Sequence, residues 1–314
     1  MTGSVGVVLP PDLEASLLLP YAAAAERLGF GEIWVVEDCF LRGGIAQAAV
    51  VLASTRAIRV GIGILPVAAR NPAFAAMELA TLAELYPGRL TIGLGHGMPG
   101  WMRQVGAWSA SPLTLLAEYL DALRALLHGE RVRTSGRYVQ LDGVQLAHPI
   151  TSPPELLAGV RGPRSLAVSG RHADGTILAE PLTPEYIAAA RGSLNAPAGH
   201  RIVGYSVAAV HDDPAVAREQ ARPGLQWVGE PDWAPHLAPL DFAQELADLR
   251  AACADRAAFT AALPDVWVDR LAVVGTPTSA RARLEELFSA GADSVVLYPG
   301  PDPSAALTQL ARVL

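Results

Sequence analysis

The chain has 314 residues, 51% of them hydrophobic, which is enough for one large core and typical of a barrel of roughly 250 residues with insertions. Its formal net charge of -7 argues against a nucleic acid or an anionic membrane as a partner, because both require a basic face. All 24 basic residues are arginine, which excludes Schiff-base and P-loop chemistry that depends on a lysine amine.

Apolar segments alternate with helical segments along the chain, and each apolar run ends near a glycine or an acidic residue. The predicted strands cover residues 5–9, 32–37, 58–65, 90–94, 156–160, 176–179, 203–210 and 294–297. The predicted helices cover residues 13–28, 45–54, 73–85, 112–127, 162–172, 184–191, 278–290 and the end of the chain from about 304. This alternation predicts an α/β protein with a (β/α)8 barrel, in which the strands are parallel and buried on both faces.

We expect residues 1–314 to form a single domain with two excursions from the barrel. Residues 135–146 alternate as a small hairpin does, and residues 97–111 form a polar loop. Prolines and tryptophans interrupt the pattern over residues 211–266, which we interpret as an insertion or lid near strands seven and eight. No apolar run approaches the roughly 18 residues of a membrane-spanning helix, and we expect no targeting segment at the start of the chain. Two cysteines cannot form a disulfide framework, so we expect a cytoplasmic, reduced protein.

In parallel barrels the active site lies at the carboxyl ends of the strands, so the candidate residues are those that follow each apolar run. Gly159-Val160-Arg161-Gly162-Pro163-Arg164 joins a strand to a helix and offers free N–H groups, a positive helix end and two arginines, as an anion cradle does. A tight loop with a solvated arginine pair is the alternative.

Three other candidates follow strands two and four. Asp38 is a candidate base or cofactor contact, and His96 is either such a group or a hydrogen-bonded structural residue. Cys39 lies beside two acids, which should raise its pKa and make it a poor thiolate, so packing is its alternative role. The glycines at these strand ends would let a flat ligand approach the main chain. No metal-binding spacing occurs among the seven histidines and two cysteines.

Three segments carry a resemblance to a known family. Arg89-Leu-Thr-Ile-Gly-Leu-Gly-His-Gly97, Ser111-Pro-Leu-Thr114 with the helix that ends at His128-Gly-Glu130, and Gly162 to Gly175 are similar, in order and spacing, to the bacterial luciferase-like oxidoreductases. Within that family the chain resembles in particular the branch of methylenetetrahydromethanopterin reductase. The resemblance spans nearly the whole chain and implies a (β/α)8 barrel that binds FMN or the deazaflavin coenzyme F420.

The same resemblance assigns cofactor contacts by position. Ile62-Gly63-Ile64 lies where family members often have a non-proline cis peptide in a bulge that backs the central ring. Asp38, Gly97 and Met98 lie where family members contact the ring or its side chain, and Gly159 to Arg164 where they bind the phosphate. Gly95 and Glu180, at the ends of strands four and six, complete the expected cofactor site.

The chain departs from the sugar-phosphate-oxidising branch of this family. Cys39 and Met98 stand where that branch has a histidine and a glutamate, which puts alcohol or sugar-phosphate oxidation in doubt and leaves the pocket without a strong base. We therefore expect hydride transfer between coenzyme F420 and a small organic substrate. FMN-dependent monooxygenation and a cofactor-binding barrel without catalysis are the alternatives, and a metal-dependent hydrolase is the least supported. The resemblance also implies a homodimer that packs through the helix at 73–86, with Arg42, Arg70, Arg161 and Arg164 as candidates to bind an acidic cofactor tail.

Overall fold

A computed structural model of the chain describes residues 3–314. Nine parallel strands form one sheet, and eight of them close into a barrel because β8 pairs with β9. The barrel strands are β1 (Ser4–Val8), β2 (Glu32–Val35), β3 (Arg59–Pro66), β4 (Leu90–Gly95), β7 (Glu155–Gly159), β8 (Gly175–Leu178), β9 (Arg201–Val210) and β11 (Ser294–Tyr298). The predicted (β/α)8 fold is confirmed.

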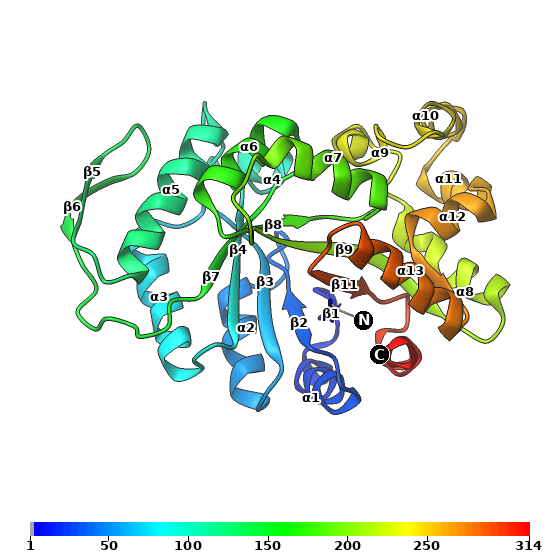
Figure 1. Ribbon diagram of the computed structural model, residues 1–314, viewed down its shortest axis with the longest axis horizontal. Coiled ribbons are helices and arrows are strands. Elements are labelled where there is room, and N and C mark those ends of the chain that lie inside the picture. The colour runs from blue at the N-terminus through cyan, green and yellow to red at the C-terminus, as the bar shows by residue number, and fades with distance from the viewer. Residues whose placement is uncertain (1–2) are drawn as a thin grey trace.

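A helix follows each barrel strand and covers the outside of the ring (Figure 1). These helices are α1 (Leu18–Leu28), α2 (Gly44–Ser54), α3 (Pro72–Leu85), α5 (Pro112–Leu127), α6 (Pro163–His172), α7 (Pro184–Leu194), α13 (Pro277–Ser289) and α14 (Pro303–Leu310). Many begin with proline in the first turn, where the missing N–H costs nothing. Asn71 and Thr183 also cap the helices that follow them, since each side chain accepts a hydrogen bond from a backbone N–H.

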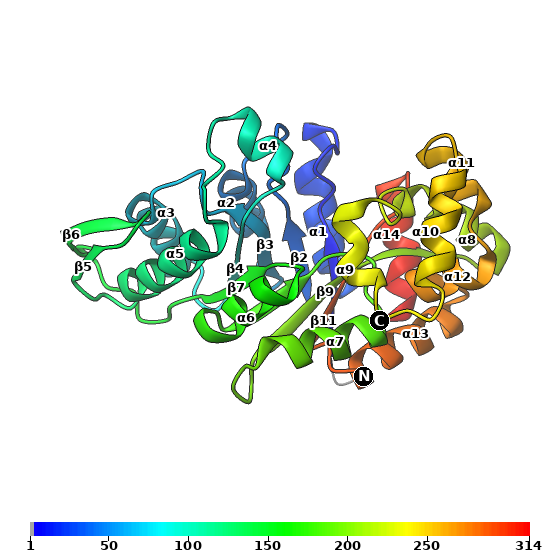
Figure 2. The same cartoon turned by 90° about the horizontal axis from the view of Figure 1, so that it is seen from above.

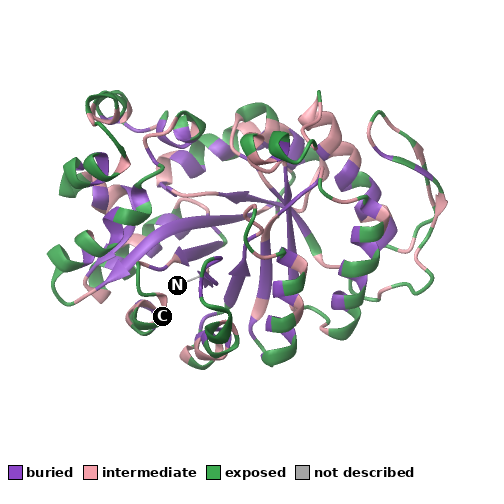
Figure 3. Cartoon of the chain, turned by 180° about the vertical axis from the view of Figure 1, so that it is seen from behind, coloured by how far each residue is buried: buried purple, intermediate pink, exposed green. Residues whose placement is uncertain are grey.

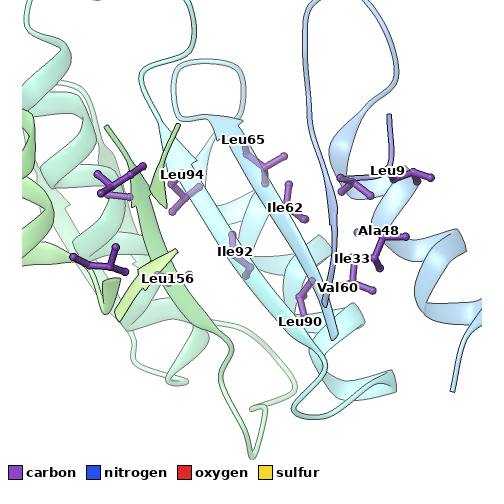
Figure 4. Close-up of a cluster of buried hydrophobic side chains, with 14 of the residues drawn as sticks. Leu9, Ile33, Ala48, Val60, Ile62, Leu65, Leu90, Ile92, Leu94 and Leu156 are labelled. Carbon is purple, nitrogen blue, oxygen red and sulfur yellow. The ribbon is translucent and has the colours of Figure 1, made fainter. Parts of the chain in front are cut away.

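The main core lies between the strands and these helices. Figure 3 shows buried residues along the strands and on the inner faces of the helices, with exposed residues on the outer faces. Figure 4 shows part of this layer, in which alternate residues of neighbouring strands, such as Val60 and Ile62 of β3 and Leu90 and Ile92 of β4, point to the same side. The alternation follows from the two-residue period of a strand.

The inside of the barrel is filled by a second, smaller cluster. Val8, Trp34, Leu157, Ile177, Val203, Tyr205 and Val296 are its buried members. Below them, at the amino ends of the strands, Glu32 is 2% exposed and accepts hydrogen bonds from Arg59, Arg201, Trp34 and Ser294. This end of the barrel is therefore closed by a buried ionic network, which leaves the carboxyl end for a ligand.

Two excursions leave the barrel at opposite ends of the molecule (Figure 1). The hairpin of β5 (Val132–Ser135) and β6 (Gln140–Val144) begins slightly earlier than predicted. The segment after β9 contains α8 (Pro214–Ala221), α9 (Ala234–Leu237), α10 (Ala243–Ala252), α11 (Arg256–Ala262) and α12 (Asp265–Leu271). The predicted polar loop at 97–111 also contains a short helix, α4 (Pro99–Gln104).

The long strand β9 explains how the inserted helices are attached. Its first half pairs with β8 and β11 inside the barrel, and its last three residues pair with β10 (Val273–Gly275), a strand that the sequence pattern did not indicate. The inserted helices pack on this outer part of β9 and form a separate hydrophobic cluster with it. Within residues 3–314, no helix is both long and apolar enough to cross a membrane.

Candidate active site

The residues that follow the strands lie together at the carboxyl end of the barrel. Predicted strand two reaches residue 37, but β2 ends at Val35, so Asp38 and Cys39 stand in the loop beyond it. His96, Gly97 and Met98 follow β4, the segment Gly159–Arg164 joins β7 to α6, and Glu180 follows β8. The structure thus brings these predicted residues to one face from four different strands.

The strand β3 contains the expected bulge. The peptide bond between Gly63 and Ile64 is cis, and the register with β4 shifts between Ile62 and Leu65. As a result Ile62 faces the outer core, whereas the side chain of Ile64 turns into the barrel and lies over Gly93, Gly95 and Gly159. Ile64 is therefore the apolar surface on which a ligand at this end of the barrel would rest.

We expected the glycines of β3 and β4 to let a ligand approach the main chain. In the structure they instead make room for neighbouring protein atoms. A Cβ atom at Gly61 would overlap the ring of Trp34, and one at Gly63 would overlap the hydroxyl of Tyr205. A Cβ atom at Gly95 would lie 2.7 Å from the carbonyl oxygen of Gly159 and 3.0 Å from Ile64. These positions are small because large side chains of the barrel interior occupy the space beside them.

Polar groups without partners gather below and beside this surface. The Tyr205 hydroxyl and the Nδ1 atom of His96 are both buried without a hydrogen-bond partner. Buried polar atoms are nearly always paired in proteins, so both atoms could bind a ligand that completes their hydrogen bonds. Tyr205 was not identified from the sequence, because a tyrosine inside a strand resembles any core aromatic residue.

His96 is connected to the helix that begins the predicted anion cradle. Its Nε2 atom lies 3.1 Å from the Ser165 hydroxyl of α6, and burial lowers the pKa of its imidazole, which favours the neutral form. No side chain caps the first turn of α6, and the space next to Gly162 is open. The free N–H groups of this turn therefore remain available to an anion.

The two arginines of the cradle differ in their surroundings. Arg164 is exposed, whereas the guanidinium of Arg161 lies over the Trp233 ring at 4.2 Å from its centre. Trp233 belongs to the inserted segment, as does His236 of α9, which stacks on Tyr186 of α7 at 4.3 Å between ring centres. Figure 2 shows α9 between the barrel and α10, so these contacts attach the insertion to the ends of β7 and β8.

Asp38 and Glu180 are the carboxyl groups of this face. Among residues 3–314 they are the acidic side chains that are shielded from solvent and yet have no hydrogen-bond or ion-pair partner on another residue. Burial raises the pKa of both groups. A desolvated carboxyl group therefore follows β8 as well as β2 at this end of the barrel.

The raised pKa predicted for Cys39 agrees with the structure, whereas Arg42 and Arg70, two candidates for a cofactor tail, bind groups of the protein itself. Burial and the charges of Glu37 and Asp38 raise the pKa of Cys39, as expected. Arg70, which we considered for a cofactor tail, is bound by Glu37 through contacts of 2.6 and 2.7 Å, and Arg42 donates to the carbonyl of Pro11. No cluster of three potential metal ligands occurs in the described part of the chain.

Comparisons with known proteins agree with this architecture. A family model described as luciferase-like monooxygenase matches residues 6–294. The 5,10-methylenetetrahydromethanopterin reductase of Methanolobus tindarius is 26% identical over 321 residues, with 98% of each chain covered.

Two solved structures share the fold. The coenzyme F420 dependent tetrahydromethanopterin reductase of Methanopyrus kandleri superposes with a TM-score of 0.85 at 21% identity, over 100% of this chain and 99% of that one. The oxygenating constituent of 3,6-diketocamphane monooxygenase from Pseudomonas putida, in complex with FMN, superposes with a TM-score of 0.76 at 16% identity, over 100% of this chain and 97% of that one.

Proposed function

Because the chain belongs to the luciferase-like monooxygenase family, we propose that it is an oxidoreductase that binds coenzyme F420 at the carboxyl end of the barrel and transfers a hydride to or from a small organic substrate. The end-to-end similarity to a methylenetetrahydromethanopterin reductase, which covers 98% of both chains, and the shared fold of a coenzyme F420 dependent tetrahydromethanopterin reductase together support the choice of cofactor. When bound, the deazaflavin supplies or accepts the hydride.

The residues of the site fit such a ligand. A flat ring has an apolar support in Ile64, and polar atoms that need partners stand near it, namely the Tyr205 hydroxyl and His96 Nδ1. The uncapped first turn of α6 and Arg164 offer N–H donors and positive charge to a phosphate. We assign ring contacts to Asp38, Gly97 and Met98, and phosphate contacts to Gly159–Arg164.

The protein's own part in the reaction is to position the substrate and to exclude water. The inserted segment stands beside the ends of β7 and β8 through Trp233 and His236, so a substrate between it and Ile64 would be shielded from solvent. We propose that this segment, within residues 211–266, carries the substrate contacts.

FMN-dependent monooxygenation is the second candidate. The FMN-bound oxygenating constituent of 3,6-diketocamphane monooxygenase shares the fold, and by the family resemblance Cys39 and Met98 stand where the sugar-phosphate-oxidising branch has a histidine and a glutamate. A barrel that binds the cofactor without catalysis is the third candidate, and it rests on the same two departures.

Parallel titration of the purified protein with coenzyme F420 and with FMN, followed by fluorescence quenching, tests the cofactor assignment. We expect micromolar binding of F420 and much weaker binding of FMN. The reverse preference would refute F420 dependence in favour of the monooxygenase, and failure of both to bind would refute the proposed function.

The same fluorescence titration tests the anion cradle formed by Gly159–Arg164. Arg164→Ala should weaken F420 binding severalfold or more, because a charge-assisted contact to a phosphate is lost, while the melting temperature stays nearly unchanged. Arg171→Ala is the matched control, since Arg171 is an exposed arginine at the other end of α6. Equal affinity of both variants and the wild type would remove Arg164 from the phosphate site.

We also propose a homodimer formed through α3. Phe74, Met77 and Leu85 of this helix are each more than half exposed, and Val50 of the neighbouring α2 is 46% exposed. Single exposed apolar residues are normal, but several on adjacent helices indicate a covered face. Light scattering should give a dimer for the wild type and a monomer for Phe74→Glu, with Val266→Glu on α12 as the control; a monomeric wild type would refute this assembly.

A further inference from the structure

Arg161 belongs both to the anion cradle and to the contact between the barrel and the inserted segment. Its main chain lies in the segment Gly159–Arg164, just after β7. Its guanidinium lies over the Trp233 ring, with Cζ 4.2 Å from the ring centre. Trp233 ends a short helical turn of the inserted segment, Pro231–Trp233. One side chain therefore joins the segment expected to bind a phosphate to the segment expected to cover the substrate.

The contact with Trp233 leaves the hydrogen-bonding capacity of Arg161 largely unused. A cation–π contact uses the positive charge and supplies no strong acceptor, so it leaves the five N–H donors of an arginine available. No ion pair within residues 3–314 includes Arg161, and its guanidinium makes one marginal hydrogen bond, 3.5 Å from Nη1 to the carbonyl oxygen of Asp232. The group is thus held by its charge while its donors remain open to an anion.

The Trp233 ring is itself held by the inserted helices. It is 6% exposed and stacks on Trp227, with 5.8 Å between ring centres and 20° between planes. Arg256 of α11 lies over the Trp227 ring at 3.6 Å and donates from Nε to Glu230 at 2.9 Å. Glu230 also accepts a hydrogen bond of 3.1 Å from Arg250 of α10. The position of Trp233, and with it that of Arg161, therefore depends on α10 and α11.

The main chain of the cradle is connected to the insertion as well. The carbonyl oxygen of Arg161 accepts a hydrogen bond of 3.1 Å from the Tyr186 hydroxyl. Tyr186 is buried and stacks on His236 of α9, which is fully buried. The insertion therefore reaches the cradle by two routes, one through the guanidinium of Arg161 and one through its carbonyl group.

Arg164, the other cation of the cradle, is not held in this way. It is exposed, and within residues 3–314 its side chain takes part in no hydrogen bond, ion pair or cation–π contact. A free arginine side chain loses rotamer entropy when a ligand fixes it, whereas one that already rests on a buried ring loses less. Arg161 is therefore the pre-organised donor of the pair.

We propose that Trp233 is a positioning residue of the phosphate site, which holds Arg161 in place to bind the phosphate, and that a phosphate bound by Arg161 in turn fixes the inserted segment against the barrel. The inference rests on the proposed function, which assigns a cofactor phosphate to Gly159–Arg164. The two effects are equal in free energy by linkage, because an insertion whose docking favours phosphate binding is itself docked more firmly by phosphate.

The first test uses inorganic phosphate and needs no cofactor. Hydrogen–deuterium exchange of the backbone amides in residues 226–238 is measured in phosphate and in a chloride solution of the same ionic strength and pH. We expect exchange in the wild type to be severalfold slower in phosphate, since local opening of a docked segment becomes rarer. The distant hairpin, residues 132–144, should not respond, and Arg161→Ala should abolish the effect. Equal exchange in both solutions would overturn the coupling.

The second test is a double-variant cycle in which the affinity for coenzyme F420 is measured by fluorescence titration. Arg161→Ala should weaken binding about tenfold or more, because a charge-assisted contact to phosphate is lost. Trp233→Ala should weaken it about threefold to tenfold, the loss expected for a shielded cation–π contact. The double variant should bind no more weakly than Arg161→Ala, since Trp233 acts through Arg161. Trp233→Phe keeps an aromatic face and should restore most of the affinity.

Matched controls separate positioning from a general loosening of the fold. Arg171→Ala removes an exposed arginine at the other end of α6, and Trp267→Ala removes a tryptophan that stacks on Phe242 within the insertion. Both should bind F420 within about twofold of the wild type, the scatter of independent sites. The melting temperature of every variant is recorded, and an affinity loss in Trp267→Ala as large as that in Trp233→Ala would overturn the assignment.

The outcomes distinguish the inference from the function on which it rests. Binding of F420 with unchanged affinity in Trp233→Ala, or with losses that multiply in the double variant, would refute the positioning role alone. No F420 binding by the wild type would refute the proposed function. The exchange experiment in inorganic phosphate then still decides whether an anion at the cradle fixes the insertion.

Discussion

The contact between Gly63 and Tyr205 gives a sharp test of how the bulge in β3 is supported. In Gly63→Ala the added methyl group would overlap the Tyr205 hydroxyl and would lie 3.1 Å from the ring carbon that bears it and 3.2 Å from the Trp34 ring. Overpacking of this kind in a dense core typically costs about 1–3 kcal/mol of unfolding free energy. We expect Gly63→Ala to lose that amount.

Removing the hydroxyl should relieve most of this cost. Tyr205→Phe deletes a buried hydroxyl that has no partner, so alone it should be neutral or slightly stabilising. In the double variant the methyl group meets only the two ring contacts, which small shifts of the rings can absorb. We therefore expect the double variant to be more stable than Gly63→Ala by about 1 kcal/mol or more, a coupling well above the scatter of independent sites.

Urea denaturation of the four proteins without cofactor measures this coupling. Gly192→Ala is the control, because the space beside Gly192 in α7 is open, and alanine there should stabilise the helix by about 0.5–1 kcal/mol. Additive effects of the two substitutions, within about 0.5 kcal/mol, would show that the Tyr205 hydroxyl does not limit the residue at position 63.

Three further predictions follow from other parts of the molecule. Glu32→Ala should lower the unfolding free energy by about 3–5 kcal/mol, because it removes the carboxylate that accepts hydrogen bonds from Arg201, Trp34 and Ser294. A loss below about 1 kcal/mol in urea denaturation would contradict the importance of this network at the amino end of the barrel. His236 has its pKa lowered from 6.5 to about 3, mainly by burial, so the unfolded chain binds a proton that the native protein excludes. The contribution of the neutral His236 ring to the unfolding free energy is therefore complete above pH 6.5 and is lost as the pH falls toward 3. In His236→Phe the unfolding free energy should decline less over this pH range. Identical plots of unfolding free energy against pH for the variant and the wild type would contradict the burial of His236 as a neutral ring. Cys39→Ser should retain turnover within a few-fold, and alkylation of Cys39 by iodoacetamide at pH 7.5 should be slower than that of glutathione, since its pKa is raised; fast alkylation or complete loss of activity would show a reactive thiolate.

Much of the barrel can be predicted from the sequence because its determinants are local. Continuous apolar runs such as 90–94, helix starts such as Asn71-Pro72 and the alternation between them are properties of short segments, and each run could be placed within a few residues. Parallel strands joined by helices then have few possible arrangements. The bulge at Gly63–Ile64 was located by resemblance to the family, and the structure contains a cis peptide there.

The strand β10 and the division of β9 could not be predicted in this way. Val273–Gly275 has only three residues, and it is a strand because it pairs with Ala208–Val210, more than 60 positions earlier in the chain. The tight glycines of β3 and β4 were equally ambiguous, since the sequence does not show that Trp34 and Tyr205 occupy the space beside them.

The sequence by itself determined which residues follow the strands, and therefore which side chains could meet at the carboxyl end of the barrel. Only the tertiary structure decided which of them are paired. Glu37 and Asp38 are adjacent acids, yet Arg70 binds the first and nothing in residues 3–314 binds the second, while Glu180 stands unpaired beside the insertion. Pairing and desolvation depend on atoms from distant parts of the chain, so the sequence could not show which of these carboxyl groups are paired.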